Sequence, residues 1–327
     1  MSHPRNFFLI TQRFEDQVGD ALSFIWASYC GMWKIHRDAN ALNDALGVSN
    51  WKDAEKYLLG DVPDAGGIDL KEIAIRRSWV QHQLTFEQMM LVQMAALYED
   101  WTVQFSSLVS PGLPKIAEVL QFPEVMPRNK LPSNHPKTWV GWWNAIDASP
   151  SALIQSDYRP ALMAQYAPTT SSLNALLCWF RFFKECRNAS VHNGGEHSKS
   201  SVQAYASASV TDLMDIGLSR NVDLRQAPIE GEKIELGIKN AQLGLAVIGR
   251  LANGFDALLC HSMDAESYMV ARIKEAVMAK GSSAIPSAKS NGREKLIRSA
   301  LAAARLPLPK DFANTDVLFK KNNLIAF

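Results

Sequence analysis

The chain has 327 residues, of which 47% are apolar, which is ample for a packed core. Its 34 Lys and Arg against 33 Asp and Glu leave a formal net charge of +1, so the chain as a whole has no field that would draw it to nucleic acid or to a membrane. Any anion-binding site must therefore be local. The cysteines follow no zinc-site or disulfide-framework spacing, and we expect reduced thiols that pack as small apolar residues at Cys30, Cys178, Cys186 and Cys260.

The sequence contains no segment that predicts a membrane span or a secretion signal. Near the N-terminus the apolar run FFLI extends over only four residues before Thr11 and Gln12, which is too short for the core of a signal peptide. The longest apolar-rich stretches are interrupted by Arg181 and Arg250, and neither reaches the length of about 18 uncharged residues that a span requires. We therefore expect a cytoplasmic protein without membrane contact.

Apolar residues recur at helical spacing along most of the chain, whereas the alternation typical of strands is scarce. The clearest helical segments, in chain order, are 13–46, 86–108, 171–193, 233–262 and 293–305. The sequence therefore predicts an all-α protein built as a helical bundle.

Stretches rich in Gly and Pro separate these segments, at 60–67, 110–114, 122–137 and 281–292. The last stretch has the composition of a flexible linker. From these breaks we interpret 1–80 as an N-terminal helical region, 81–265 as a helical core, and 266–327 as a linker and C-terminal tail. We expect the tail to pack back on the core or to contact a partner.

The most informative stretch is RFFKECRNASVHNGG, residues 181–195. At about 100° per residue its polar side chains fall on one narrow helix face, formed by Arg181, Lys184, Glu185, Asn188 and His192. The opposite arc, about 200° wide, is apolar, which predicts a helix buried in the bundle that exposes only this polar strip. Gly194 and Gly195 should end the helix just after His192, because glycine accepts the left-handed conformation of a C-cap.

Arg187 and His192 together have the chemistry to act on a phosphate. The arginine guanidinium binds phosphate oxygens through a planar fork of donors, and histidine gives and takes a proton near neutral pH. In a straight helix the two residues lie about 140° apart, so they converge on one phosphate only if the helix distorts or if two chains meet. The second option predicts a homodimer.

The pattern Arg187-Asn188-x-x-x-His192, on a mostly buried helix of an all-α bundle, resembles the motif of the HEPN superfamily (higher eukaryotes and prokaryotes nucleotide-binding domains). In that family four to six residues separate Arg and His, and the residue after Arg is commonly Asn, Asp or His. The upstream segment LVQMAALYEDWTVQF resembles an early helix of such domains, with Glu99 as the best candidate for its acidic residue. The resemblance covers about 86–265.

The resemblance implies a bundle of HEPN type, with additional N-terminal helices and a C-terminal tail, that works as a metal-independent endoribonuclease. RNA carries its own nucleophile, the 2′-hydroxyl, so the enzyme has only to move protons and stabilise charge. His192 would be the acid or base, Arg187 the charge clamp, and Asn188 would orient a phosphate or the opposing motif across a dimer. No metal-ligand motif is visible in the sequence, so we expect no metal and no cofactor.

RNA is the expected substrate, and the other polar residues near the motif are expected to help bind it, namely Arg181, Lys184, His197 and Glu99. Many HEPN proteins are toxins or defence effectors, so a neutralising or sensor partner protein is also expected. Two alternatives remain open. In the first alternative, the chain is a catalytically silent HEPN-like module that binds nucleic acid or acts as a scaffold. In the second, it is a structural helical protein in which Arg187 and His192 are incidental.

Several residues have a structural interpretation beside the functional one. Arg187 and His192 are of the types that often cap a helix end, and His197 fits a solvated loop. The tryptophans of KTWVGWWNAI could stack on bases, but their spacing favours the core for Trp139, Trp142 and Trp143. Arg76 and Arg77 beside Trp79 are interpreted as a solvated basic face.

Overall fold

A computed structural model describes residues 6–46, 51–60, 69–109, 117–123, 138–224, 226–279 and 290–324. Within these ranges the chain forms helices, turns and one isolated antiparallel bridge, between Glu196 and Lys233, and it forms no strand. The predicted all-α class is confirmed. In the described part of the chain, no helix is both long and apolar enough to cross a membrane.

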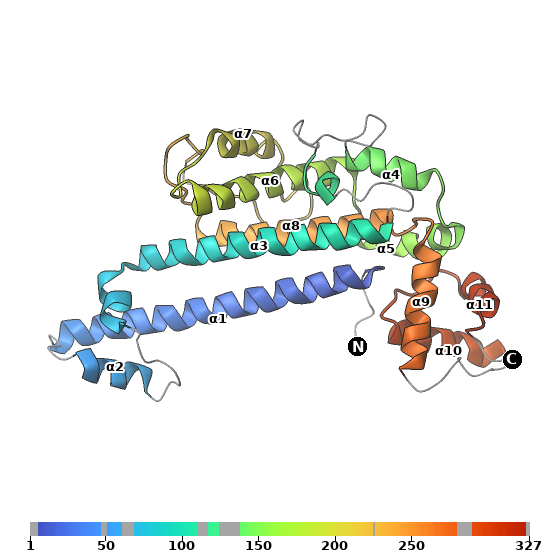
Figure 1. Ribbon diagram of the computed structural model, residues 1–327, viewed down its shortest axis with the longest axis horizontal. Helices are drawn as coiled ribbons and strands as arrows, with labels where there is room; N and C mark the ends of the chain where they lie inside the picture. The colour runs from blue at the N-terminus through green and yellow to red at the C-terminus, as the bar shows by residue number, and fades with distance from the viewer. Residues whose placement is uncertain are drawn as a thin grey trace.

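Four long helices form the main body (Figure 1). They are α1 (Leu9–Leu46), α3 (Trp79–Val109), α6 (Thr170–His192) and α8 (Ile238–Leu259). α3, α6 and α8 pack against one another, and α1 runs along α3 and also contacts α8. Gly244 permits the close approach of α8, since a Cβ atom there would lie 2.7 Å from Sδ of Met94 on α3.

Shorter helices surround this body. They are α2 (Trp51–Leu59), α4 (Trp139–Asp147), α5 (Arg159–Tyr166), α7 (Lys199–Ala208), α9 (Ala265–Met278), α10 (Ser290–Ala303) and α11 (Phe312–Lys321). Three short turns complete the set: the π-helical η1 (Glu72–Arg76) and η3 (Ile154–Tyr158), and the 3₁₀ turn η2 (Ala117–Leu120). α7 packs on α6, and α9, α10 and α11 form a lobe at one end of the molecule (Figure 1).

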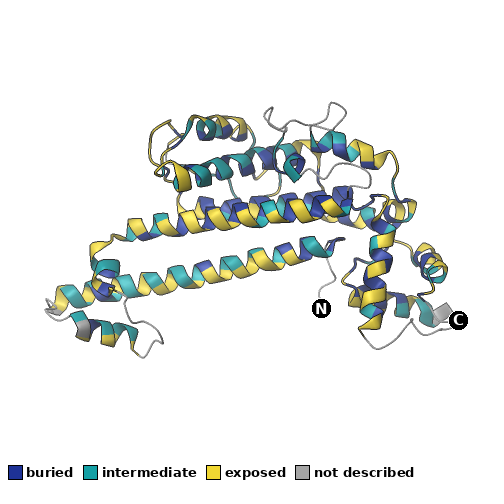
Figure 2. Ribbon diagram, in the orientation of Figure 1, coloured by how far each residue is buried: buried dark blue, intermediate teal, exposed yellow. Residues whose placement is uncertain are grey.

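The core is rich in aromatic side chains and lies between the long helices (Figure 2). On α3, Tyr98 stacks on Trp101 with 5.5 Å between ring centroids, and Trp101 stacks on Phe105 at 4.5 Å. Trp139 and Trp142 are fully buried and Trp143 is half-buried, so the core interpretation of the three tryptophans is confirmed. Cys186 and Cys260 are buried as expected, whereas Cys30 is exposed.

The N-terminal apolar run belongs to this same core. Phe7 and Phe8 are fully buried, and their backbone N–H groups donate to the carboxylate of Asp256 on α8 at 2.6 and 3.0 Å. Asp256 therefore anchors the two residues that precede α1, and the first N–H of the helix, that of Leu9, donates to Tyr268 Oη at 2.8 Å. The expected 80/81 boundary falls inside α3, so α1 and α3 pack together across it.

The C-terminal tail packs back on the rest of the chain, as one of the two sequence expectations had it. α10 contacts α9 and α11, and Leu301 and Phe319 are buried in the main core cluster. The 265/266 boundary lies at the first residue of α9. Of the predicted breaks, 110–114 lies wholly outside the described residues, and the other three lie mostly outside them.

Candidate functional site at the end of α6

The start and the end of α6 are both fixed by local structure. At the start, Thr169 and Ser172 form a capping box, in which each side chain bonds to the other residue's backbone N–H. At the end, Gly194 and Gly195 adopt φ values of 64° and 79°, and Gly195 N–H donates to the carbonyl of Ala189 at 3.1 Å. The predicted termination is confirmed, and it leaves His192 exposed in the last turn.

The segment that follows α6 is held by a distant part of the chain. The carbonyl of Gly195 accepts from Ile234 N–H at 2.9 Å, and His197 N–H donates to the carbonyl of Glu232 at 2.8 Å. Lys233 Nζ also donates to the carbonyl of Gly194 at 3.0 Å. These bonds hold 233–236 outside the helix, so the helix predicted over 233–262 begins only at Ile238, after Gly237 with φ 77°. The surroundings of His192 are therefore ordered by tertiary contacts.

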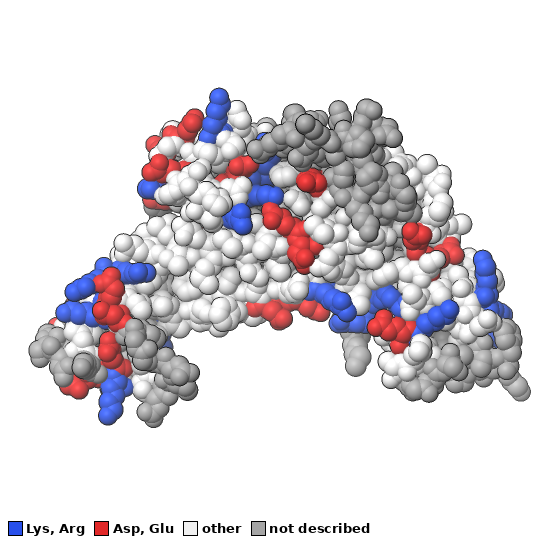
Figure 3. Space-filling view, in the orientation of Figure 1, with Lys and Arg blue, Asp and Glu red and all other residues white. Residues whose placement is uncertain are grey.

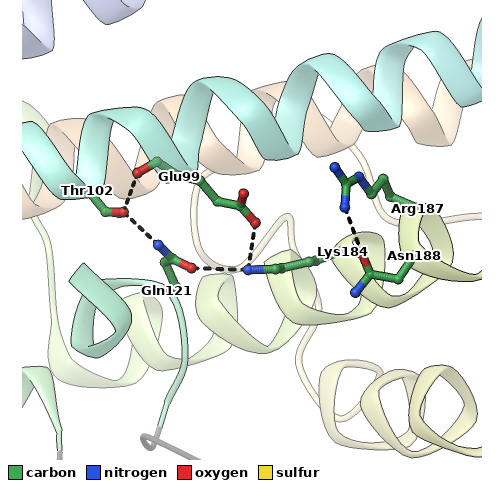
Figure 4. Close-up of polar contacts among 6 residues, drawn as sticks. All are labelled: Glu99, Thr102, Gln121, Lys184, Arg187 and Asn188. Carbon is green, nitrogen blue, oxygen red and sulfur yellow. Dashed lines mark hydrogen bonds and ion pairs between the residues drawn. The ribbon is translucent and has the colours of Figure 1, made fainter. Parts of the chain in front are cut away.

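Arg187 lies one and a half turns before His192 and is oriented by its neighbour. Its Nη1 donates to Oδ1 of Asn188 at 2.9 Å (Figure 4). Arg187 is half-buried, and its Nε is buried without a hydrogen-bond partner among the described residues. A guanidinium held in this way keeps donors that a phosphate oxygen could accept from.

Lys184 reaches across to α3 and η2. Its Nζ lies 2.6 Å from Oε1 of Glu99 and donates to Oε1 of Gln121 at 3.1 Å (Figure 4). Gln121 in turn donates to Oγ1 of Thr102 at 2.8 Å, and Thr102 Oγ1 donates to the carbonyl of Glu99 at 2.8 Å. Both charges of the pair are therefore compensated.

This ion pair corrects the expectation of one solvent-facing polar strip along α6. The Lys184 side chain is 17% exposed and lies between α6, α3 and η2, because Glu99 stands opposite it. Glu185 is also engaged, since its carboxylate accepts from Ser200 Oγ on α7 at 3.0 Å. Arg181 is half-buried. Only the last part of the strip, around His192, is open to solvent.

His197 is placed differently from the solvated loop that its sequence context suggested. It is 7% exposed, and its Nδ1 lies 3.1 Å from Oγ of Ser201. Burial lowers the pKa of His197, an effect that the carboxylate of Glu232 partly opposes. The ring lines a cleft of about 400 Å³ together with Glu232 and Lys233. A neutral, enclosed imidazole adds no positive charge for binding RNA.

Two residues that sequence reasoning did not single out take part in this region. Gln121 joins the Lys184–Glu99 pair to α3, and no local signal predicts a contact between such distant residues. Glu87 on α3 is 7% exposed and lines a cleft of about 740 Å³. Burial is the main cause that raises its pKa to about 7, with a hydrogen bond from the backbone of Gly237 acting against it and the carboxylate of Glu235 adding to it. Its position on the apolar side of α3, four residues before Leu91, is the signal that could have revealed it.

Across the ranges that the structure covers, no group of three or more His, Cys, Asp and Glu side chains could hold a metal ion. No protein-family model, curated protein or solved structure matches the chain. A proposal for the function of the chain therefore rests on the chemistry of α6 and of the residues around it.

Proposed function

We propose that this chain is a metal-independent endoribonuclease of HEPN type that acts as a homodimer. The proposal rests on the presence of an arginine and a histidine near the end of α6. Arg187 is a half-buried guanidinium oriented by Asn188 at 2.9 Å, and His192 is an exposed imidazole in the last turn. These are the groups that cleavage of RNA by its own 2′-hydroxyl requires.

The chemistry needs two proton transfers and one charge clamp. One His192 would remove the proton of the 2′-hydroxyl while the 2′-oxygen attacks phosphorus. A second His192, from the other chain, would give a proton to the departing 5′-oxygen, so that the products are a 2′,3′-cyclic phosphate and a 5′-hydroxyl. Arg187 would stabilise the negative charge of the phosphorane between these steps.

The helix geometry favours two chains over one. Arg187 and His192 lie about 140° apart around a regular α-helix. Arg187 projects toward α3 (Figure 4), whereas His192 is exposed at the helix end. Apposition of two α6 ends about a two-fold axis would bring Arg187 of one chain toward His192 of the other. A toxin or defence role, held in check by a neutralising or sensor partner, is part of the same proposal.

One observation favours a second candidate, a catalytically silent HEPN-like nucleic-acid-binding or scaffold module. Two of the side chains expected to bind substrate have structural partners, because Lys184 is paired with Glu99 and His197 is enclosed beside Ser201. Such a site would have few cations left with which to hold RNA for cleavage. This module would bind a partner through the same end of α6 without cutting RNA.

The test is cleavage by the purified full chain in excess EDTA. A single-stranded RNA should be cut to products that end in 2′,3′-cyclic phosphate and 5′-hydroxyl, and DNA of the same sequence should remain intact because it lacks the 2′-hydroxyl. His192→Ala protein prepared in parallel is the control for contaminating ribonucleases. Cleavage that needs added magnesium, or that persists in His192→Ala, would contradict the mechanism. Absence of cleavage in the wild type would favour the silent module.

A further inference from the structure

An aromatic cluster lies where α1 meets the start of α3, away from the α6 motif. The ring of Trp33 on α1 contacts Trp79 on α3 edge to face, with 4.8 Å between centroids and an interplanar angle of 62°. Trp79 in turn contacts Tyr29 at 5.0 Å, and His36 lies 6.4 Å from Trp33. Trp79 therefore supports Trp33 from behind and fixes the plane of its ring.

Trp33 is exposed to an extent that core packing does not explain. Its exposed fraction is 44%, whereas Trp101, Trp139 and Trp142 in the bundle core are at most 1% exposed. A large indole ring held rigidly by a second tryptophan, with much of its surface in water, has the form of a stacking platform for a base.

Two cations lie next to this pair of tryptophans in the chain. Lys34 follows Trp33 directly on α1, and Arg77 precedes Trp79 by two residues. Both are exposed, and neither forms an ion pair with a residue in the described ranges. Figure 3 shows Lys and Arg side chains gathered over this end of the molecule, with acidic ones among them. Lys34 and Arg77 therefore offer exposed positive charge beside the tryptophans.

Two further arginines lie nearby in weak pairs. Arg37 lies 2.8 Å from Asp38, and Arg76 lies 3.0 Å from Glu72, with the arginine side chains 60% and 65% exposed. Exposed pairs of this kind are easily exchanged for another anion, because water already screens them. Each arginine can therefore turn donors toward a phosphate without a large cost.

We propose that Trp33, Lys34, Arg77 and Trp79, here called the Trp33 surface, bind single-stranded RNA. A base would stack on the exposed face of Trp33, and Lys34 and Arg77 would contact the adjacent phosphates. The choice of RNA over DNA rests on the proposed function. Single strands are favoured over duplexes because only unpaired bases present a free face for stacking. A protein partner is disfavoured because cations interrupt the apolar area on both sides.

The Trp33 surface lies toward the same end of the molecule as the end of α6 (Figure 1). Two clefts that share Glu235 and Leu236 lie in this part of the molecule, one lined by Val80, which follows Trp79 in the chain, and the other by His197, five residues after His192. A strand bound at Trp33 would extend from there toward the proposed cleavage site at the same end of the molecule. The surface would serve to capture RNA, while Arg187 and His192 would cut it.

The experiment measures binding with a probe that cannot be cleaved. A fluorescein-labelled 2′-O-methyl oligoadenylate lacks the nucleophilic hydroxyl, so its affinity for the full chain is read by anisotropy without any reaction. Trp33→Ala should weaken binding roughly five- to one-hundred-fold, the range that loss of one base–aromatic stack produces. The matched control is Phe24→Ala on the same helix, where Phe24 is 66% exposed and precedes Lys34 by ten residues. It should bind within about two-fold of the wild type.

Charge reversal gives an independent measurement. Lys34→Glu should weaken binding and reduce its dependence on salt, whereas Lys274→Glu, at an exposed position of α9, should not. If Trp33→Ala unfolds, two other variants are compared with the wild type. The affinities of Trp33→Phe, which keeps an aromatic ring, and of Lys34→Glu then decide whether the Trp33 surface binds the probe. Equal affinity of Trp33→Ala and Phe24→Ala in folded proteins would overturn the proposal. So would failure of the wild type to bind the probe, which would leave the surface to a protein partner.

Failure of this proposal and failure of the ribonuclease proposal give different results. If the probe binds through Trp33 but the wild type cuts no RNA, the Trp33 surface stands and the cleavage mechanism falls. If RNA is cut and Trp33→Ala binds and cuts like the wild type, the mechanism stands and the Trp33 surface falls.

Discussion

Lys184 of α6 and Glu99 of α3 form an ion pair, with 2.6 Å between Nζ and Oε1, three residues before Arg187. Two of the four residues expected to bind substrate thus bind each other. The pair fixes the spacing of α6 from α3 beside the guanidinium of Arg187 (Figure 4). We infer that its main contribution is to position α6 and that it does not hold RNA directly.

Removal of one partner should therefore reduce stability more than it reduces RNA binding. Glu99→Gln leaves the Lys184 charge, whose side chain is 17% exposed, without its carboxylate and should cost about 1–2 kcal/mol. Lys184→Met should cost less, because Glu99 is 36% exposed and can reach water. Urea unfolding of both single variants and the double variant gives the coupling energy, expected near 1 kcal/mol.

The exposed pair Arg298–Glu294 is a matched control for this ion pair. It joins consecutive turns of α10 at 2.7 Å, with side chains 48% and 53% exposed. Glu294→Gln should change stability by no more than about 0.5 kcal/mol. The opposite result would be a Lys184→Met protein that is as stable as the wild type but binds the oligonucleotide much more weakly. It would show that Lys184 contacts the substrate.

Asp256 should be among the residues on which the fold depends most. Its buried carboxylate accepts the N–H groups of Phe7 and Phe8 at 2.6 and 3.0 Å. Asp256→Asn places an amide donor against one of these N–H groups and should cost about 2–3 kcal/mol. Hydrogen exchange should show faster exchange at Phe7 and Phe8 in particular. Asp100→Asn, on an exposed part of α3, is the control, and an equal effect of both substitutions would contradict this role.

The sequence predicted those parts of the structure that depend on local pattern. Helical periodicity located the long helices, and the Gly194–Gly195 pair located the end of α6, because periodicity and cap chemistry act within a few residues. The tryptophan spacing at Trp139 and Trp142 correctly indicated the core.

The parts that sequence reasoning did not place depend on contacts between distant segments. His197 is enclosed because its backbone bonds to Glu232, which lies thirty-five residues away in the chain. The same bonds delay the start of α8, although 233–237 has acceptable helical composition. The ion pair of Lys184 joins helices whose packing no single-helix projection describes. A helical-wheel projection gives the direction of each side chain around one helix axis, but tertiary packing decides which side chains are exposed to solvent.

Glu87 should make the protein less stable as the pH rises. Burial raises the pKa of Glu87 to about 7 in the folded chain, against 4.5 for an ordinary glutamate. Between these values the folded chain keeps a proton that the unfolded chain has lost. The free energy of unfolding therefore falls as the pH increases through this window and stays lower above it. A shift of this size corresponds to a contribution of at most about 3 kcal/mol.

Glu87→Gln isolates this contribution. Burial also raises the pKa of Asp256 to about 7, which gives the wild type a second titration of the same sign. Asp256 is present in both proteins, so the difference between their profiles belongs to Glu87. Urea unfolding at several pH values from 5 to 8 should show a flatter profile for Glu87→Gln and the larger gain over the wild type at pH 8. Parallel profiles would show that Glu87 ionises normally.

Catalytic and structural roles on α6 should separate when three of its residues are compared. His192→Ala removes an exposed side chain and should change stability by no more than about 0.5 kcal/mol. Arg187→Ala removes a half-buried one and should cost about 1 kcal/mol. Phe183→Ala empties a fully buried site and should cost about 3–5 kcal/mol.

RNA cleavage should follow the opposite order. Loss of His192 removes the general acid or base and should slow cleavage about 10²- to 10⁴-fold, and loss of Arg187 should slow it about 10²- to 10³-fold. Phe183→Ala should lose activity only to the extent that it unfolds, because its ring contacts Trp179 and Phe182 and not the substrate. Cleavage rates and thermal melts of the same preparations make the comparison. If all three variants lose cleavage in proportion to their melting temperatures, Arg187 and His192 act through the fold, and the ribonuclease proposal fails.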